Sequence, residues 1–405
     1  MKRKKPKNNA ARINMALYTF LLIATPFLLV RNYLQQAVGM LSQLSFSVAG
    51  MNIPYVLSAA ILALLLVIII NIRHLRLLHL LVILITIILM GIGQSSTDYY
   101  FNHDFYELQH NWHYFAYGIF AWISYLYHKS INTSRVKYIW FTSLQAVLIS
   151  VFDEGAQIFI SGRVFDICDN GKDIWGTMVG LIIVLLLTRD KEEKIKLLYR
   201  KPLANLQNPW SSMFILLLFS YIFLNISSIL TESRYIPSAI LWSFIVYIPL
   251  ILLLFFLQFR WSRVAVIVLL ATIVVSGSIT IKKNSTNIII QKQAGRLSWR
   301  GIPVPWFDLM VQTDGVPKLV DKKIYFNKKD KINRIYGLCE DIMLIGSGTK
   351  GQGGKGFSSE KSYFVFNPIT RRPLQILVYP NLQACRIYNQ LQADGKKVLL
   401  IIHNG

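Results

Sequence analysis

The segment SVFDEGAQIFISGRVFDICDNGKDIWGTMVG, residues 150–180, joins the end of one apolar run to the start of the next. Glu154 and Gln157 are three residues apart, and Asp169 and Asp173 are four apart. On a helix, residues with these spacings share a face. The segment therefore predicts two helices of a polytopic membrane protein, with polar faces that meet where both helices leave the membrane.

Acidic side chains outnumber basic ones across residues 153–173, where five acids accompany two basic residues. Carboxylates at the end of a span are costly to desolvate, so they normally bind a cation or line a wet cavity. Arg163 is the expected partner because its planar guanidinium matches a carboxylate, and it should reach at least one of Glu154, Asp169 and Asp173. The alternative is a buried network that only holds the two spans together.

Gly176 and Gly180 continue the second helix with a G-x-x-x-G spacing. Small residues at this spacing let two helices approach each other closely. We therefore expect both glycines to lie in a helix–helix contact.

The composition of the whole chain also predicts a membrane protein. Its 405 residues are 54% hydrophobic and 16% charged, and the mean hydropathy is +0.43. Soluble globular proteins carry roughly 25% charged residues, so these values exclude a disordered chain and an ordinary cytosolic enzyme. The uncharged segment 32–52 is expected to be an interfacial or re-entrant helix. Apolar runs of spanning length predict about nine α-helical spans: 14–30, 53–72, 75–93, 112–128, 136–152, 173–188, 209–228, 236–258 and 264–281.

Basic residues in the short loops predict the orientation of these spans. With the N-terminus in the cytoplasm, the inner segments hold 19 Lys and Arg residues and the outer loops hold 4. Loops 94–111, 153–172 and 229–235 are then extracytoplasmic, and an odd number of spans puts the C-terminal domain outside as well. Because the net charge of +23 is divided between short loops and the tail, no nucleic-acid partner is predicted.

After Lys282 the sequence changes to polar and basic stretches that alternate with short apolar runs. Residues 382–394 have the pattern of an amphipathic helix, which we expect to pack through Leu382, Ile387 and Leu391. Strands alternating with a helix predict a small C-terminal α/β domain. Four runs have the character of strands: 341–346, 363–366, 374–379 and 398–402.

Neither a cofactor nor a disulfide framework is predicted. GSGTKG, residues 346–351, matches a glycine-rich nucleotide-binding pattern, but QGGKGF follows it where that motif requires a helix. The three cysteines, Cys168, Cys339 and Cys385, include no CxxC pair. A single disulfide between Cys339 and Cys385 is compatible with the sequence, but nothing in the sequence selects it. The expected organisation has five parts: a basic cytoplasmic N-terminus (1–13), N-terminal spans (14–93), a central membrane domain (94–188), three further spans after a basic cytoplasmic loop (189–282) and the soluble α/β domain (283–405).

The pattern D-E-x-x-Q-x-F-x-x-G-R-x-x-x-x-x-D-x-x-x-D-x-x-G-x-x-x-G, which begins at Asp153, resembles the signature of the VanZ-like membrane proteins. Upstream, HYFAYGIFAW (113–122) is similar to that family's second motif, a histidine at the start of a span. The resemblance covers residues 94–188. Gln109 stands where family members commonly carry an Asp. Three nearby residues are candidates to replace that Asp: Asp104, Glu107 and His110.

The resemblance implies a multi-pass protein of the bacterial cytoplasmic membrane with a role in the cell envelope, since the best-known family member is linked to teicoplanin resistance. Its expected partners are membrane lipids or lipid-linked, cell-wall-related envelope components, with no cofactor. Two alternatives stay open. One is an enzyme with Glu154 as general base, in which Asp169 and Asp173 hold a metal or a substrate cation; the other is a scaffold that binds a protein through its C-terminal domain. The implied ligand-binding or structural network consists of His113, Asp153, Glu154, Gln157, Arg163, Asp169 and Asp173.

The tail resembles a second family. CEDIMLIGSGTKG (339–351) and ACRIYNQLQADGKKVLLIIH (384–403) are similar to two motifs of small α/β proteins that include mitochondrial complex I assembly factor 3. Ser347 and Ile387 replace threonines of those motifs. The resemblance covers residues 287–405 and implies a fold without a catalytic function. Known members lie inside cells or in the mitochondrial matrix, whereas the span count puts this tail outside.

Overall fold

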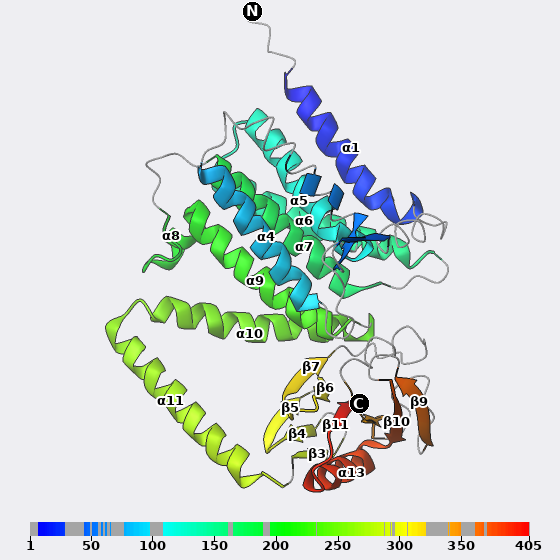
Figure 1. Cartoon of the computed structure of the whole chain (residues 1–405). Helices are drawn as coiled ribbons and strands as arrows, with labels where there is room; N and C mark the ends of the chain where they lie inside the picture. The colour runs from blue at the N-terminus through cyan, green and yellow to red at the C-terminus, as the bar shows by residue number, and fades with distance from the viewer. Residues whose placement is uncertain are drawn as a thin grey trace, which may run out of the picture. The chain divides into compact units, whose positions relative to one another are not determined.

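The computed structural model divides the chain into two compact units (Figure 1). The first consists of Met1–Thr97, His103–Ser228 and Ser233–Phe255, and the second of Asp98–Asn102, Ile229–Glu232 and Phe256–Gly405. The structure describes residues 7–28, 44–48, 51–55, 58–59, 61–62, 65, 77–97, 108–160, 165–188, 195–231, 233–286, 288–291, 293, 296–305, 307–320, 339, 341–349, 361–367 and 371–404.

The first unit is mainly α-helical. A hairpin of β1 (Ser45–Val48) and β2 (Met51–Pro54) precedes α4. The predicted helix at 32–52 is therefore wrong for the hairpin residues, and residues 29–43 lie outside the described part. Phe46 pairs with Ile53 across the hairpin, and aromatic and β-branched residues suit strands. The helices are α1 (Lys7–Leu28), α4 (Leu77–Thr97), α5 (Leu108–Ser130), α6 (Arg135–Gln157), α7 (Ile167–Leu187), α8 (Pro202–Gln207), α9 (Pro209–Ile229), the 3-10 helix η1 (Ser233–Tyr235) and α10 (Ile236–Phe256).

Helix α7 lies at the centre of this unit, in contact with α4, α5 and α6 (Figure 1). Asp166 is its N-cap, and the carboxylate accepts a hydrogen bond from the backbone N–H of Cys168 at 2.9 Å. Such a cap satisfies a donor that the first turn of a helix leaves open. Farther along, Trp175 and Val179 are buried in an apolar core with Met90 of α4. The polar first turns and the apolar later turns of α7 are thus both enclosed by the surrounding helices.

Five helices of the described chain are long and apolar enough to cross a membrane. They correspond to five of the nine predicted spans, and the other four spans stay predictions. Helices α5 and α6 occupy two of those four, and polar residues such as His113 and Lys137 lower their hydropathy. Helix α1 occupies a third, and the span predicted at 53–72 lies mostly outside the described residues. The five helices are Leu77–Thr97, Ile167–Leu187, Pro209–Ile229, Ser233–Phe256 and Arg260–Lys283.

The second unit contains α11 (Arg260–Lys283) and a C-terminal β-sheet region. A six-stranded mixed sheet has the order β7-β6-β11-β8-β10-β9, and a three-stranded antiparallel sheet has the order β3-β4-β5. Helix α13 (Asn381–Ala393) packs against β3, β8 and β11. The strands are β3 (Ile289–Gln291), β4 (Arg296–Trp299), β5 (Ile302–Pro305), β6 (Asp308–Val311), β7 (Pro317–Val320), β8 (Ile342–Gly346), β9 (Lys361–Asn367), β10 (Arg372–Tyr379) and β11 (Val398–Ile402).

The strands predicted at the middle of this sheet are confirmed. Strands β10 and β11 both pair in parallel with β8, so that Leu377 and Leu400 lie opposite Leu344 on either side. All five residues of β11 are buried, as expected for a strand covered on both faces.

The helix predicted at 382–394 is confirmed as α13, but its predicted packing through Leu382 is wrong. Leu382 is 56% exposed, whereas Ala384, Cys385 and Tyr388 are buried against the strands. These three residues have the i, i+1, i+4 spacing of one helix face. Leu382 lies two positions before Ala384 and so points elsewhere, while the predicted contacts of Ile387 and Leu391 are present.

Asn389 of α13 takes the place of a missing strand partner. Its Nδ2 donates to the carbonyl of Ile289 at 2.9 Å, and its Oδ1 accepts from the backbone N–H of Ile289 at 3.1 Å. Strand β3 is an edge strand of the small sheet. The side-chain amide therefore satisfies backbone groups that an edge strand leaves unpaired.

The three cysteines are buried and form no disulfide, so the bridge considered between Cys339 and Cys385 is not present. Burial raises the pKa of the Cys385 thiol to about 12. Because the thiolate is the reactive form, we expect Cys385 in a Cys168→Ser, Cys339→Ser background to resist maleimide at pH 8 and to react rapidly after unfolding. Mass spectrometry of the labelled chain measures this, and complete labelling of the folded protein within minutes would contradict it.

Candidate functional site

A cluster of polar side chains lies at one end of the helical unit. It is formed by the N-terminal part of α5, the C-terminal part of α6 and the first two turns of α7, which meet although they are far apart in the sequence. We call it the His113 cluster, and it consists of His113, Ser150, Asp169, Asn170, Lys172 and Asp173.

Asp173 is the buried centre of the cluster. Its side chain is fully enclosed. Oδ2 accepts a hydrogen bond from Ser150 Oγ at 2.7 Å, and Oδ1 lies 2.8 Å from His113 Nδ1. Asn170 Nδ2 donates in turn to Ser150 Oγ at 2.7 Å and to the Ser150 carbonyl at 3.0 Å. A buried carboxylate is tolerated when it is paired and hydrogen-bonded in this way.

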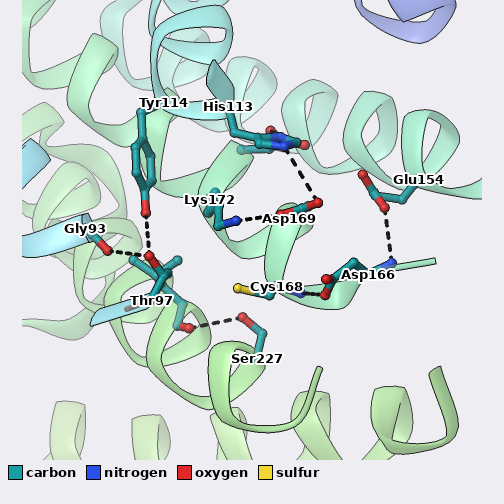
Figure 2. Close-up of polar contacts among 12 residues, drawn as sticks. Gly93, Thr97, His113, Tyr114, Glu154, Asp166, Cys168, Asp169, Lys172 and Ser227 are labelled. Carbon is teal, nitrogen blue, oxygen red and sulfur yellow. Dashed lines mark hydrogen bonds and ion pairs between the residues drawn. The ribbon is translucent and has the colours of Figure 1, made fainter. Parts of the chain in front are cut away.

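Asp169 forms the more open side of the cluster. Lys172 Nζ donates to Asp169 Oδ1 at 2.7 Å, and His113 Nε2 lies 3.7 Å from Asp169 Oδ2 (Figure 2). The side chains of His113 and Asp169 are 18% and 23% exposed. Both ring nitrogens of His113 thus face a carboxylate, an arrangement that fits the doubly protonated imidazolium, in which both nitrogens are donors.

Glu154 and Gln157 join α6 to the start of α7. Gln157 Nε2 donates to Glu154 Oε1 at 2.5 Å. The backbone N–H of Asp166 donates to Glu154 Oε2 at 3.1 Å (Figure 2). Glu154 is completely buried, and Asp153 and Gln157 are each 7% exposed. Because both oxygens of Glu154 accept hydrogen bonds inside the protein, the geometry favours a structural role for this carboxylate.

Gly176 and Gly180 lie in the contact between α5 and α7, as their spacing predicts. A Cβ added at Gly176 would lie 2.8 Å from Tyr114 Cα, and one added at Gly180 would lie 2.6 Å from the carbonyl oxygen of Gly118. Both distances are too short for a real side chain. This close approach packs α5 against α7 beside the polar cluster and so brings His113 to Asp173.

The structure brings together most of the residues predicted from the sequence. His113, Asp169 and Asp173 are in one cluster, and Glu154 and Gln157 bond to each other beside it. Arg163, the predicted cationic partner, lies outside the described residues together with Asp104 and Glu107. Within the described part of the chain, Lys172 and His113 are the cations that face Asp169.

Sequence reasoning missed three members of the cluster. Lys172 stands three residues after Asp169, a spacing that itself favours an ion pair on a helix. Ser150 and Asn170 are short polar residues that match no motif, and they gain a role only through contacts in the fold: Ser150 bonds to Asp173, and Asn170 bonds to Ser150.

Comparisons with protein-family models, with curated proteins and with solved structures found no match to this chain. Within the residues that the structure describes, no three His, Cys, Asp or Glu side chains are arranged to hold a metal ion. Asp169 and Asp173 instead face His113, Lys172 and Ser150. The described fold is thus that of a mainly helical protein with five helices of membrane-spanning length, a C-terminal β-sheet region and a polar cluster at one end of the helices.

Proposed function

We propose that this chain is a VanZ-like multi-pass protein of the bacterial cytoplasmic membrane, whose His113 cluster binds a lipid-linked or cell-wall-related ligand at the extracytoplasmic surface. Teicoplanin resistance is the linked phenotype. In this proposal the N-terminus is cytoplasmic, nine spans cross the membrane and the C-terminal α/β domain is extracytoplasmic. The observation that supports a binding site most is the graded exposure of the cluster, from enclosed Asp173 to partly open His113 and Asp169.

The open side of the cluster offers both a donor and an acceptor. His113 Nε2 and Asp169 Oδ2 are 3.7 Å apart, which is longer than a hydrogen bond, so a ligand group can bond to both. A hydroxyl or ammonium group meets this requirement, and cell-wall precursors are rich in both. The inner side of the cluster is already hydrogen-bonded, so ligand binding requires little reorganisation.

The test compares susceptibility to teicoplanin in cells that express the wild-type chain or its variants. We expect the wild type to protect cells and both His113→Phe and Asp169→Asn to abolish protection, because the first removes the ring donor and the second removes the negative charge of the acceptor. His79→Gln, which changes a histidine in the first turn of α4, is the matched control and should protect like the wild type. Binding of a purified lipid-linked peptidoglycan precursor to the protein in nanodiscs gives the direct readout.

The proposal fails if the wild-type chain neither protects cells nor binds the precursor. It also fails if His113→Phe and Asp169→Asn, present in the membrane at wild-type levels, bind the precursor as the wild type does. Immunoblots of membrane fractions provide the necessary comparison of levels.

An enzyme is the second candidate, and the His113–Asp173 pair is the observation that favours it. A buried carboxylate that bonds to one ring nitrogen orients a histidine so that the other nitrogen can transfer a proton. Here Asp173 faces Nδ1, and Nε2 lies on the partly open side. In this reading the His113 imidazolium acts as a general acid through Nε2, and Glu154 is not the general base. Conversion of the bound precursor, lost in His113→Gln while binding is retained, would distinguish the enzyme from the binding protein.

A further inference from the structure

A second polar site lies at the opposite end of α5, where α5 turns into α6. A pocket of about 320 Å³ opens there. His128, in its lining, is 15 residues after His113 on the same helix, which corresponds to about 22 Å along the helix axis. The pocket is therefore separate from the His113 cluster. Its lining consists of Tyr125, His128, Lys129, Asn132, Thr133, Arg135 and Tyr138.

His128 is the lining residue whose hydrogen-bonding state indicates a ligand. His128 is only 6% exposed, and its Nε2 atom is buried without a hydrogen-bond partner among the described residues. Nδ1 lies 3.3 Å from Thr133 Oγ1, and the ring packs beside Tyr138 and Phe141. A buried polar atom without a partner is costly and rare in folded proteins. When the Thr133 hydroxyl donates to Nδ1, Nε2 carries the proton and is a donor.

The charges around this nitrogen favour an anion. Lys129 and Arg135 both line the pocket, and none of its lining residues is an Asp or Glu. Lys129 Nζ lies 5.6 Å from the centre of the Tyr125 ring, so a cation–π contact holds it beside the pocket. The Arg135 guanidinium donates to the carbonyl of Thr188 after α7. Because Thr188 caps α7, this contact fixes the guanidinium at the rim of the pocket.

We propose that this pocket binds the phosphate group of an anionic ligand through His128, Lys129 and Arg135. Phosphate oxygens accept several charge-assisted hydrogen bonds, and the planar fork of an arginine matches them. A phospholipid headgroup and a free phosphate share this chemistry. The proposal is independent of the ligand of the His113 cluster, because neither site contributes a residue to the other.

The experiment titrates the purified full-length chain with two probes, inorganic phosphate and short-chain phosphatidylglycerol, by calorimetry in a zwitterionic detergent. We expect Lys129→Gln to weaken binding about tenfold, the loss of roughly one charge-assisted hydrogen bond. Lys137→Gln is the matched control, because Lys137 is an exposed lysine in the first turn of α6 and does not line the pocket. It should leave affinity unchanged.

His128→Phe is the second variant, since it keeps an aromatic ring and removes the Nε2 donor. We expect it to weaken binding as Lys129→Gln does while circular dichroism stays that of the wild type. Binding of phosphatidylglycerol alone would identify a lipid headgroup as the ligand, and binding of inorganic phosphate as well would identify the phosphate group itself. The proposal is overturned if neither probe binds, or if Lys137→Gln and Lys129→Gln weaken binding equally.

Discussion

Asp173→Ala is expected to lower the free energy of unfolding by about 3–5 kcal/mol, the usual cost of removing one partner of a buried ion pair. The Asp173 side chain is fully enclosed between His113 Nδ1 and Ser150 Oγ. Its removal leaves the imidazolium facing a cavity and leaves the Ser150 hydroxyl without its acceptor. Reversible unfolding of the purified protein in mixed micelles measures the change.

A double variant separates this effect from simple loss of packing. His113→Phe combined with Asp173→Leu replaces the pair with apolar side chains, which proteins tolerate far better than a broken pair. We expect the double variant to recover most of the stability lost in Asp173→Ala. Asp394→Ala, at an exposed position after α13, is the control and should change stability by less than about 0.5 kcal/mol. A double variant no more stable than Asp173→Ala would contradict the ion-pair interpretation.

Gly180→Ala is expected to have the second large effect. The added Cβ would lie 2.6 Å from the Gly118 carbonyl oxygen and 2.7 Å from Ala121 Cβ. Because the first of these is a backbone atom, α5 and α7 must move apart, and overpacking of this kind costs about 1–3 kcal/mol. Gly180→Leu should prevent the helices from packing at all. Unfolding in mixed micelles and the yield of folded protein are the measurements.

Gly91→Ala is the matched control for this prediction. Gly91 is also a helical glycine, but a Cβ built there meets nothing within 4 Å. Alanine should therefore stabilise α4 by about 0.5–1 kcal/mol, because glycine loses more conformational freedom in a helix. If Gly180→Ala were as harmless as Gly91→Ala, the close contact of α5 with α7 would not exist in solution.

The sequence predicts those parts of the candidate site that depend on short spacings. Glu154 and Gln157 share a helix face at three residues' separation and are hydrogen-bonded, and Asp169 and Asp173 share a face of α7. The contact of His113 with Asp173 spans 60 residues and depends on how α5 packs on α7. A local sequence pattern does not predict a contact between residues so far apart in the chain. For this reason His113 and Asp173 were predictable as site residues but not as a pair, and Arg163 was the expected cationic partner.

The same limit applies to the β-sheet region. Strands β8, β10 and β11 are apolar runs and were predictable, whereas β4 and β5 are four residues each and contain Arg, Ser and Pro. A turn signal was nevertheless present between them. Arg300 and Gly301 both have positive φ, 45° and 81°, as the central residues of a tight two-residue hairpin require. Glycine adopts a positive φ easily. Arginine is not a typical residue at the first position of such a turn, so the hairpin was not recognised from the sequence.

The place of β11 in the large sheet has a consequence for how the protein is made. Strand β11 lies between β6 and β8, yet it follows both of them, and every other strand of the sheet, in the chain. During synthesis the β6–β7 hairpin and the group β8, β9 and β10 emerge first, and in each the edge that β11 later covers is still unpaired. Open edges of this kind readily pair with other chains. Completion of the sheet therefore has to wait until residues 398–402 leave the ribosome, and a nascent chain stalled before them exposes two unpaired edges to chaperones and proteases.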